Sequence, residues 1–171
     1  KGSRCLTEKC AVERRAYPHG QHGQNAGRGR KTSEYAKQMR EKQKVKRMYG
    51  LTETQFRTIY TRASHLPGVK GTNLLVALET RLDNIVYRMG FAASRRAARQ
   101  LVRHGHVEVN GRKLDIPSYK VLPGQEVRVA PSDREMLAVK VAQDQASRGA
   151  TVSWLSVDAE KAAGRLLELP T

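Results

Sequence analysis

The sequence holds little that could cross a membrane and little that could form disulfides. No apolar run approaches the roughly 20 residues that a membrane-spanning helix needs, and no apolar segment of the signal-peptide kind is present. Two cysteines in 171 residues are too few for a disulfide framework. These absences argue against an integral membrane protein and a disulfide-stabilised secreted domain, and we expect a soluble cytoplasmic protein.

Motifs of enzymatic chemistry are missing as well. The chain has no recognisable nucleophile motif, no glycine-rich loop leading into a Lys-Ser or Lys-Thr pair, and no His-Glu-x-x-His. Its length allows one domain or two small ones. We therefore predict that the chain is not an enzyme.

Acidic side chains are scarce relative to basic ones. The chain has 32 Lys and Arg against 16 Asp and Glu, which gives a net charge of +16. The net charge is +10 over residues 1–60, +7 over residues 61–129 and −1 over residues 130–171. Such an excess favours a polyanionic partner, which for a soluble chain is a nucleic acid or an anionic membrane surface. We expect this partner along the first three quarters of the chain and intramolecular packing in the last.

The first third of the chain predicts a basic extension followed by two helices. Residues 14–31 combine Gly, Arg and His with almost nothing to bury, which is typical of a segment that orders against a partner. Residues 33–48 suit a helix with Ser33 as its N-cap. Residues 53–64 suit a second helix, which a capping box at Thr52 would open.

A third helical stretch is expected from Thr72, as N-cap, to Gly90, after a loop at residues 66–71. Its apolar residues recur at helical spacing and indicate a face that packs in the core. These residues are Leu75, Leu78, Leu82, Ile85, Val86 and Met89.

Residues 94–111, SRRAARQLVRHGHVEVNG, predict a basic helix that leads into a hairpin. With Ser94 as N-cap and about 100° per residue, one face holds Ala97, Ala98, Leu101 and Val102. The opposite arc of about 140° holds Arg95, Arg96, Arg99, Gln100 and Arg103. A solvated helix is the alternative, but solvated faces usually pair Glu with Lys, and this helix has no acidic residue. Because arginine suits phosphate binding and stacking on bases, we interpret this face as a nucleic-acid surface.

The segment after this helix predicts a small sheet. Alternating residues around Asn110 and Gly111 are typical of a hairpin with a type I′ turn, and residues 119–130 predict two more short strands around a Pro-Gly turn. We expect the basic helix and the hairpin to lie side by side and form one concave basic face. The fold class is α+β: an N-terminal basic extension and helical domain, then a small RNA-binding module of two helices packed on a twisted, mostly antiparallel sheet.

Residues 82–127, LDNIVYRMGFAASRRAARQLVRHGHVEVNGRKLDIPSYKVLPGQEV, resemble the small RNA-binding module named after small-subunit ribosomal protein four. That module also occurs in pseudouridine synthases, tyrosyl-tRNA synthetases and a heat-shock RNA-binding protein. Three further stretches are similar to the ribosomal protein: GQHG (20–23), YAKQMREKQKVKRMYGLTETQFRTIY (35–60) and SWLSVD (153–158). The chain is identified as a member of the bacterial-type ribosomal protein four family, without the family's usual N-terminal and C-terminal ends.

The resemblance implies a domain organisation and a set of partners. Residues 1–32 would form the basic extension, residues 33–78 the helical domain with residues 150–171 packed back on it, and residues 79–149 the module. Family members bind the 5′ domain of small-subunit rRNA and nucleate assembly of the subunit body. They lie with ribosomal proteins three and five at the channel through which mRNA enters, and they contribute to translational accuracy. Neither DNA nor a membrane is expected as a partner.

The expected rRNA contacts, carried over by matching motif or taken from the basic extension, lie in three segments of the chain. They are Arg14, Arg15, His19, Gln21, His22, Arg28, Arg30, Lys31, Tyr35, Arg40, Lys42, Lys44, Lys46, Arg47, Tyr49, Arg81, Asn84, Arg95, Arg96, Arg99, Gln100, Arg103, His104, Asn110, Lys113 and Tyr119. The alternative function is an RNA-binding stress factor or an RNA-modification factor built on the same module.

Cys5 and Cys10 have the C-x4-C spacing of half a structural zinc site. The resemblance implies that two cysteines upstream of this chain would complete a four-thiolate site, with an iron–sulfur cluster as the less favoured alternative. His19 and His22 could serve as ligands instead, although the resemblance places them on RNA. Two thiols that bind no metal are the remaining alternative.

Overall fold

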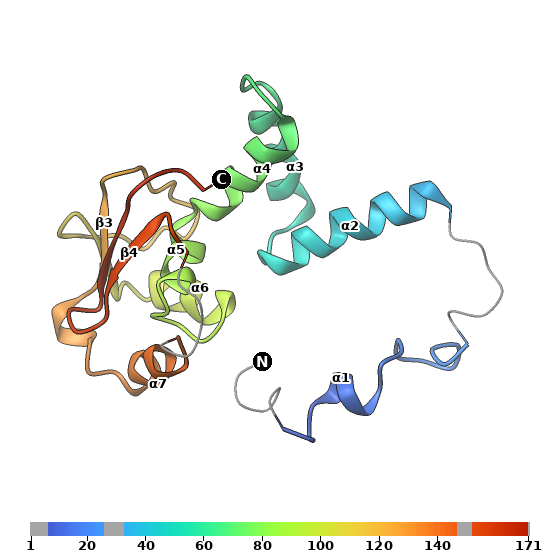
Figure 1. The fold of residues 1–171 in the computed structure, drawn as a ribbon, viewed down its shortest axis with the longest axis horizontal. Helices are drawn as coiled ribbons and strands as arrows, with labels where there is room; N and C mark the ends of the chain where they lie inside the picture. Colours follow the sequence, from blue (N-terminus) through green and yellow to red (C-terminus); the bar gives the residue numbers. More distant parts are fainter. Residues whose placement is uncertain (1–6, 26–32, 147–151, 171) are drawn as a thin grey trace. The chain divides into compact units, whose positions relative to one another are not determined.

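The computed structural model describes residues 7–25, 33–146 and 152–170. The chain divides into two compact units, Lys1–Met48 and Tyr49–Thr171, which Figure 1 draws as ribbons. This division differs from the three segments expected from the sequence. The helices between Tyr49 and residue 79 belong to the same unit as the module that follows them.

The described residues of the first unit form two helices, α1 (Ala11–Arg14) and α2 (Glu34–Met48). The predicted N-cap of α2 is confirmed, because Ser33 Oγ accepts a hydrogen bond from the Ala36 amide at 3.3 Å. Neither helix contains a buried residue. Such a helix draws little stability from packing within its own unit and leaves its side chains accessible to a partner.

The loop between these helices is shaped by a close backbone approach at Gly23. The Gly23 amide donates to the Gly20 carbonyl at 3.0 Å, and a Cβ at position 23 would lie 1.8 Å from the carbonyl oxygen of Pro18. Only glycine fits this turn. His19 and His22, on either side of its tip, are exposed.

The second unit begins with α3 (Glu53–Ser64) and α4 (Lys70–Glu79). The predicted capping box is present: Gln55 N–H donates to Thr52 Oγ1 at 3.3 Å, and Thr52 N–H donates to Gln55 Oε1 at 3.2 Å. The predicted N-cap of the next helix is wrong. Val69 holds that position in α4, so the loop expected at residues 66–71 is shorter than its pattern indicated.

The predicted single helical stretch from Thr72 to Gly90 is in fact two helices, α4 and α5 (Leu82–Arg88). A distant segment binds the start of the second helix. The first amides of α5, those of Leu82 and Asp83, donate to the carbonyls of Tyr119 and Pro117 at 2.9 and 3.2 Å. The chain changes direction at Arg81, whose backbone is extended (φ −68°, ψ 139°). Leu75 of the predicted core face is half-exposed, whereas the other five residues of that face are buried.

Helix α6 (Arg95–Arg103) precedes a five-stranded antiparallel sheet of order β2-β1-β3-β5-β4. Its strands are β1 (Val107–Val109), β2 (Arg112–Lys113), β3 (Glu126–Val129), β4 (Leu155–Asp158) and β5 (Ala163–Leu166). The predicted type I′ turn is confirmed by the positive φ of both Asn110 (49°) and Gly111 (76°). The expected strand near residue 120 is absent from this sheet. That segment forms only an isolated bridge, between Lys120 and Arg81.

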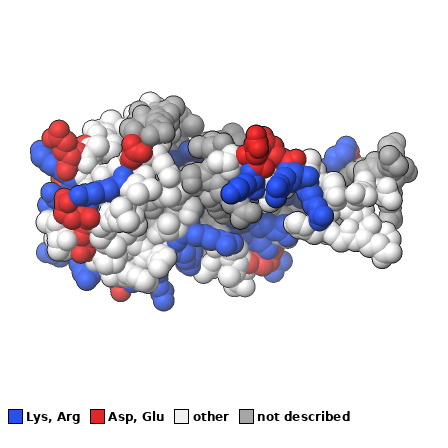
Figure 2. Space-filling model, turned by 90° about the horizontal axis from the view of Figure 1, so that it is seen from below, with Lys and Arg blue, Asp and Glu red and all other residues white. Residues whose placement is uncertain are grey.

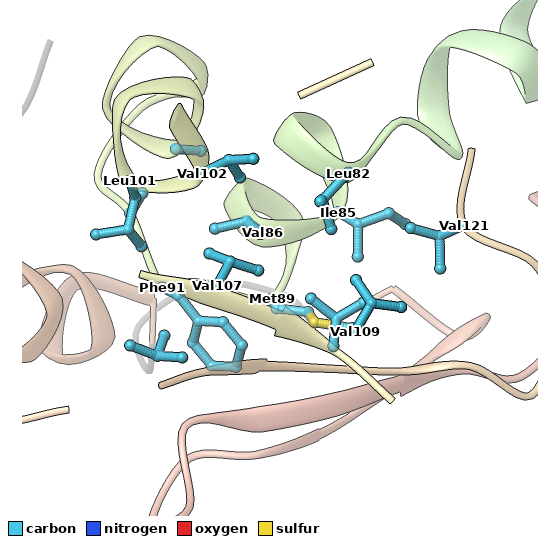
Figure 3. Packing of buried hydrophobic residues seen from close by; sticks show 14 of the residues in the cluster. Leu82, Ile85, Val86, Met89, Phe91, Leu101, Val102, Val107, Val109 and Val121 are labelled. Atoms are coloured by element: carbon cyan, nitrogen blue, oxygen red, sulfur yellow. The ribbon is translucent and has the colours of Figure 1, made fainter. Parts of the chain in front are cut away.

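The hydrophobic core lies between α5, α6 and the sheet, as Figure 3 shows. Ile85 and Val86 of α5 and Val102 of α6 have no exposed surface, and neither do Val107 and Val129 of the sheet. After β3, a 3-10 turn (η2, Pro131–Asp133) leads to α7 (Leu137–Ala146). Val139 of α7 is also fully buried in this core. The predicted packing of helices on an antiparallel sheet is therefore confirmed.

The C-terminal hairpin completes the sheet. Strand β5 pairs with β3, with Val127 opposite Gly164, so two of the five strands come from the segment expected to pack on the helical domain. Residues near the end of the chain also reach α4, which belongs to the expected helical domain. Val152, Trp154 and Pro170 line one pocket together with Leu75 and Val76 of α4.

Candidate nucleic-acid interface

Helix α6 has the two faces that its sequence predicts. Ser94 Oγ caps it by accepting from the Ala97 amide at 3.2 Å, and Ala98, Leu101 and Val102 are buried. Arg96, Gln100 and Arg103 on the opposite side are exposed. The buried residues attach the helix to the core, so the exposed residues are held on a rigid support.

Arg95 is bound within the protein rather than presented to solvent. Its side chain is 20% exposed. The Nε–H group donates to Asn84 Oδ1 at 2.8 Å, and the guanidinium carbon lies 4.9 Å from the ring centre of Tyr49 and 4.7 Å from that of Tyr87. Two aromatic faces and an amide therefore hold this arginine in place.

A buried carboxylate, Glu79, lies at the centre of this arrangement. It accepts hydrogen bonds from Tyr49 Oη at 2.5 Å, Asn84 Nδ2 at 2.7 Å and Arg88 Nη2 at 2.7 Å. Burial alone would raise the pKa of the Glu79 carboxyl, but the hydrogen bonds from Arg88, Tyr49 and Asn84 outweigh burial and lower it. Burial, and then the hydrogen bond to Glu79, raise the pKa of Tyr49 to about 12. Glu79 is thus ionised and Tyr49 neutral at physiological pH.

A second buried carboxylate, Asp83, binds Arg81. Arg81 Nε and Nη2 donate to the two oxygens of Asp83 at 3.1 and 2.8 Å, and both side chains are 7% exposed. Arg99 Nη1 lies 3.6 Å from the same carboxylate. The basic helix therefore does have acidic neighbours, and they come from α4 and α5 rather than from its own turns.

An open cleft of about 630 Å³ lies between α3, α6 and the loop at residues 115–118. Its lining residues are Thr54, Gln55, Thr58, Ile59, Arg62, Arg81, Arg99, Arg103, Asp115, Ile116, Pro117 and Ser118. Four of these are arginines. That α3 and α6 both line this cleft was not predicted from the sequence.

The hairpin lies close to the end of α6, as expected. A Cβ built on Gly105, just after α6, would lie 2.2 Å from Lys113 Cε, so the Lys113 side chain of β2 covers that backbone. The outer face of the sheet is not uniformly basic, because Arg128 pairs with Glu108 at 2.7 Å across two strands. Acidic side chains also stand between basic ones on the face drawn in Figure 2.

The residues expected on rRNA differ in how much of their surface is exposed. The exposed ones are Arg14, Arg15, His19, Gln21, His22, Tyr35, Arg40, Lys44, Arg47, Arg96, Gln100, Arg103, His104, Asn110 and Lys113. The partly buried ones are Lys42, Lys46, Arg95, Arg99 and Tyr119. Arg28, Arg30 and Lys31 lie outside the described residues, as does Cys5.

Tyr49, Arg81 and Asn84 are the least exposed of the described residues expected on rRNA. All three are buried, with 9%, 6% and 1% of their surface exposed. Tyr49 and Asn84 bind Glu79, and Arg81 binds Asp83, so their polar groups are already used inside the unit. They support the arginine face from beneath, and a direct RNA contact for them stays a prediction.

Glu79, Asp83 and Arg62 were not predicted from the sequence. Two of these carried a signal, because Glu79 and Asp83 are ionisable residues inside a stretch whose apolar face was expected to pack in the core. Buried charges need partners, and the nearest opposite charges in the sequence are Arg81 and Arg88 of the same stretch. Arg62 carried no such signal, since its position over the cleft depends on how α3 packs.

The metal prediction is not tested by the described part of the chain. Among residues 7–25, 33–146 and 152–170, no three His, Cys, Asp or Glu side chains are grouped so that they could hold an ion. Cys10 precedes α1 as its N-cap residue. The residues described therefore do not supply a zinc site by themselves.

Taken together, an arginine-bearing helix, a basic hairpin and an arginine-lined cleft on one small α+β unit define a nucleic-acid-binding protein. Within the described residues, every helix is too short or too polar to span a bilayer.

Comparisons with known proteins give the family. Residues 1–79 match the ribosomal protein S4/S9 N-terminal domain, and residues 80–127 match the S4 domain. The chain belongs to the ribosomal protein S4 family. It is 53% identical over 170 residues to the small ribosomal subunit protein uS4 of Thermodesulfovibrio yellowstonii, a match covering 99% of this chain and 80% of that protein. It is 53% identical over 171 residues to the protein of the same name from Thermus thermophilus, with the same coverage.

Proposed function

We propose that this chain is a structural constituent of the small ribosomal subunit and binds small-subunit rRNA directly. Its relatives are named as small-subunit ribosomal proteins, and its family is one of structural, non-enzymatic proteins. On this proposal the protein works on the ribosome, in the cytoplasm. The match of residues 1–79 to the family's N-terminal domain favours this role over a stress or RNA-modification factor, which would share only the module.

The observation that carries the proposal is the set of basic side chains held rigidly on α6 and β2. Arg96, Arg103 and Lys113 are exposed, and none of them takes part in an ion pair between described residues. Most of their contacts would be to phosphates and sugars, because A-form RNA hides its base edges and is recognised by shape. The exposed residues of α2, and the loop around Gly23, would add a second contact region.

The finer parts of the proposal concern assembly and decoding. We infer that the protein binds the 5′ domain of the rRNA early and nucleates assembly of the subunit body. It would adjoin ribosomal proteins three and five at the channel through which mRNA enters, and so influence accuracy. The C-terminal hairpin, which completes the sheet and carries little net charge, is the surface we assign to protein neighbours.

The direct test is binding of the full chain to a transcript of the 5′ domain, measured across a salt series against an unrelated RNA of equal length. Replacing Arg96, Arg103 and Lys113 by Gln should weaken binding and reduce the magnitude of the salt slope by about 2 to 3, since each lost phosphate contact removes about 0.9 or less. Arg95 and Arg99 are left in place, because their loss would also disturb the carboxylates beneath them. Equal affinity of the unmodified protein for both RNAs would refute the proposal.

We also propose that Cys10 contributes to a structural zinc site together with Cys5 and two cysteines from upstream residues. The described residues of the first unit bury little, and four thiolates around zinc can order a segment that lacks a core. An iron–sulfur cluster on the same thiolates is the alternative, and metal analysis distinguishes the two.

A further inference from the structure

The arginine-lined cleft has walls from two helices that face each other. Thr54, Thr58 and Arg62 follow one another at four-residue intervals along one face of α3, and Arg99 and Arg103 are one turn apart on α6. The loop with Asp115 closes the third side. At about 630 Å³, the cleft lies in the size range of sites for small organic ligands.

The four arginines of the cleft are not equivalent. Asp83 binds Arg81 through both of its oxygens and lies 3.6 Å from Arg99, so its single negative charge matches Arg81 and offsets Arg99 only in part. Arg62 and Arg103 are exposed and pair with no acidic group among the described residues. The unmatched positive charge of the cleft is therefore on its two opposite walls, which is where an entering phosphate would find it.

The rest of the lining is unsuited to a simple anion. Ile59 and Ile116 provide apolar surface, and Ile116 is 50% exposed. Asp115 adds a carboxylate, which would repel a phosphate but can accept a hydrogen bond from a hydroxyl or amino group. The Thr58 hydroxyl donates to the Thr54 carbonyl at 3.0 Å, which leaves its oxygen as a further acceptor.

A nucleotide of RNA has the three features that this lining matches: a phosphate, a flat apolar base, and donors that include the ribose 2′-hydroxyl. A nucleotide within a duplex cannot enter such a cleft, because its base is stacked and paired and its phosphates lie on a convex surface. Protein recognition of individual RNA bases accordingly uses nucleotides that have left the stack.

We propose that the cleft takes one unpaired nucleotide of the bound RNA. Its phosphate lies between Arg62 and Arg103, and its base lies against Ile59 and Ile116. This inference rests on the proposed function and deepens it. It adds a site within the interface that reads a single-stranded feature, next to the surface that binds duplex backbone.

The test compares two pairs of substitutions in the full chain. Arg62→Gln with Arg103→Gln removes the two unmatched charges of the cleft. Arg57→Gln with Arg96→Gln removes the same charge from exposed positions of the same two helices, outside the cleft. Each variant is titrated with the 5′-domain transcript, which contains unpaired nucleotides, and with a fully paired RNA duplex.

For the duplex, the two variants should lose affinity to a similar extent, because both lose two positive charges. For the 5′-domain transcript, the cleft variant should lose about tenfold more than its control, as expected for charge-assisted hydrogen bonds to one phosphate. Ile116→Ala should weaken binding of the transcript about threefold with an unchanged salt slope. It should also restore the 2′-hydroxyl acylation of at least one unpaired nucleotide that the unmodified protein protects.

If both double variants change the affinities for the two RNAs in the same ratio, no nucleotide enters the cleft and the inference is wrong, while the proposed function stands. The inference also fails if Ile116→Ala leaves the acylation pattern unchanged. If the unmodified protein does not prefer the transcript over an unrelated RNA, the proposed function itself fails.

Discussion

Replacing Glu79 by alanine removes the carboxylate that accepts hydrogen bonds from Tyr49, Asn84 and Arg88 beneath the arginine face of α6. The Tyr49 hydroxyl loses its partner in a buried position, which costs about 1–3 kcal/mol. Asn84 keeps its bond to the Glu79 carbonyl at 2.9 Å and so loses less. Arg88 is 34% exposed and can turn toward water, so losing its ion pair with Glu79 adds little to the loss of stability. We expect a loss of about 3 kcal/mol in the free energy of unfolding, a large part of the 5–15 kcal/mol of a typical domain.

The assay is urea unfolding followed by tryptophan fluorescence. The chain has one tryptophan, Trp154, which is 8% exposed and lies in the same unit as Glu79, so its signal reports that unit. Glu135→Ala is the control, because Glu135 forms an exposed ion pair with Lys140 and exposed pairs contribute little. If the urea midpoint of Glu79→Ala lies as close to that of the unmodified protein as the midpoint of Glu135→Ala does, the reasoning is refuted.

Glu79→Gln separates charge from packing by its pH dependence. Because the pKa of Glu79 is lowered in the folded state, its charge stabilises the fold above the ordinary glutamate pKa of about 4.3. That contribution is lost as pH falls through the lower pKa of the folded state. The stability difference between the unmodified protein and Glu79→Gln should therefore be largest at neutral pH and shrink in acid. A difference that stays constant from pH 7 to pH 3 would assign the effect to shape alone.

Four further outcomes are expected. Since the pKa of Tyr49 is raised to about 12, the unmodified protein should lose stability from pH 10 to 12, and Tyr49→Phe should lack this loss in alkaline unfolding curves. Gly111→Ala meets no close contact but keeps a φ of +76°, so it should cost about 1–2 kcal/mol in urea unfolding. Glu160→Lys, at an exposed position after β4, should raise miscoding in a reporter assay while leaving rRNA affinity unchanged; equal effects on both would make this surface merely structural. Protein with its natural N-terminus should bind about one zinc and lose it on Cys10→Ser, and metal-free protein purified without chelator would contradict the site.

The sequence alone determined the elements whose signals are local. The bounds of α3, its capping box, the Ser94 cap of α6 and the Asn110-Gly111 turn all depend on residues a few positions apart. The residues that make hydrogen bonds of that range are close in the sequence, so the sequence pattern predicts them. The two faces of α6 follow from helical periodicity in the same way. The family was also within reach, because its motifs are contiguous stretches.

Only the tertiary structure decided which arginines remain available. Arg95 is held by Asn84 and by Tyr49, a residue that also binds Glu79 from 30 positions away. The first amides of α5 donate to carbonyls at residues 117 and 119. Strand β5, which pairs with β3 in the sheet, comes from the C-terminal segment. Each of these features joins segments far apart in the chain, and a buried carboxylate binds whichever arginines the packing brings to it. Local propensity contains no information about that choice, because the desolvation that makes Glu79 and Asp83 need partners exists only once the core has formed.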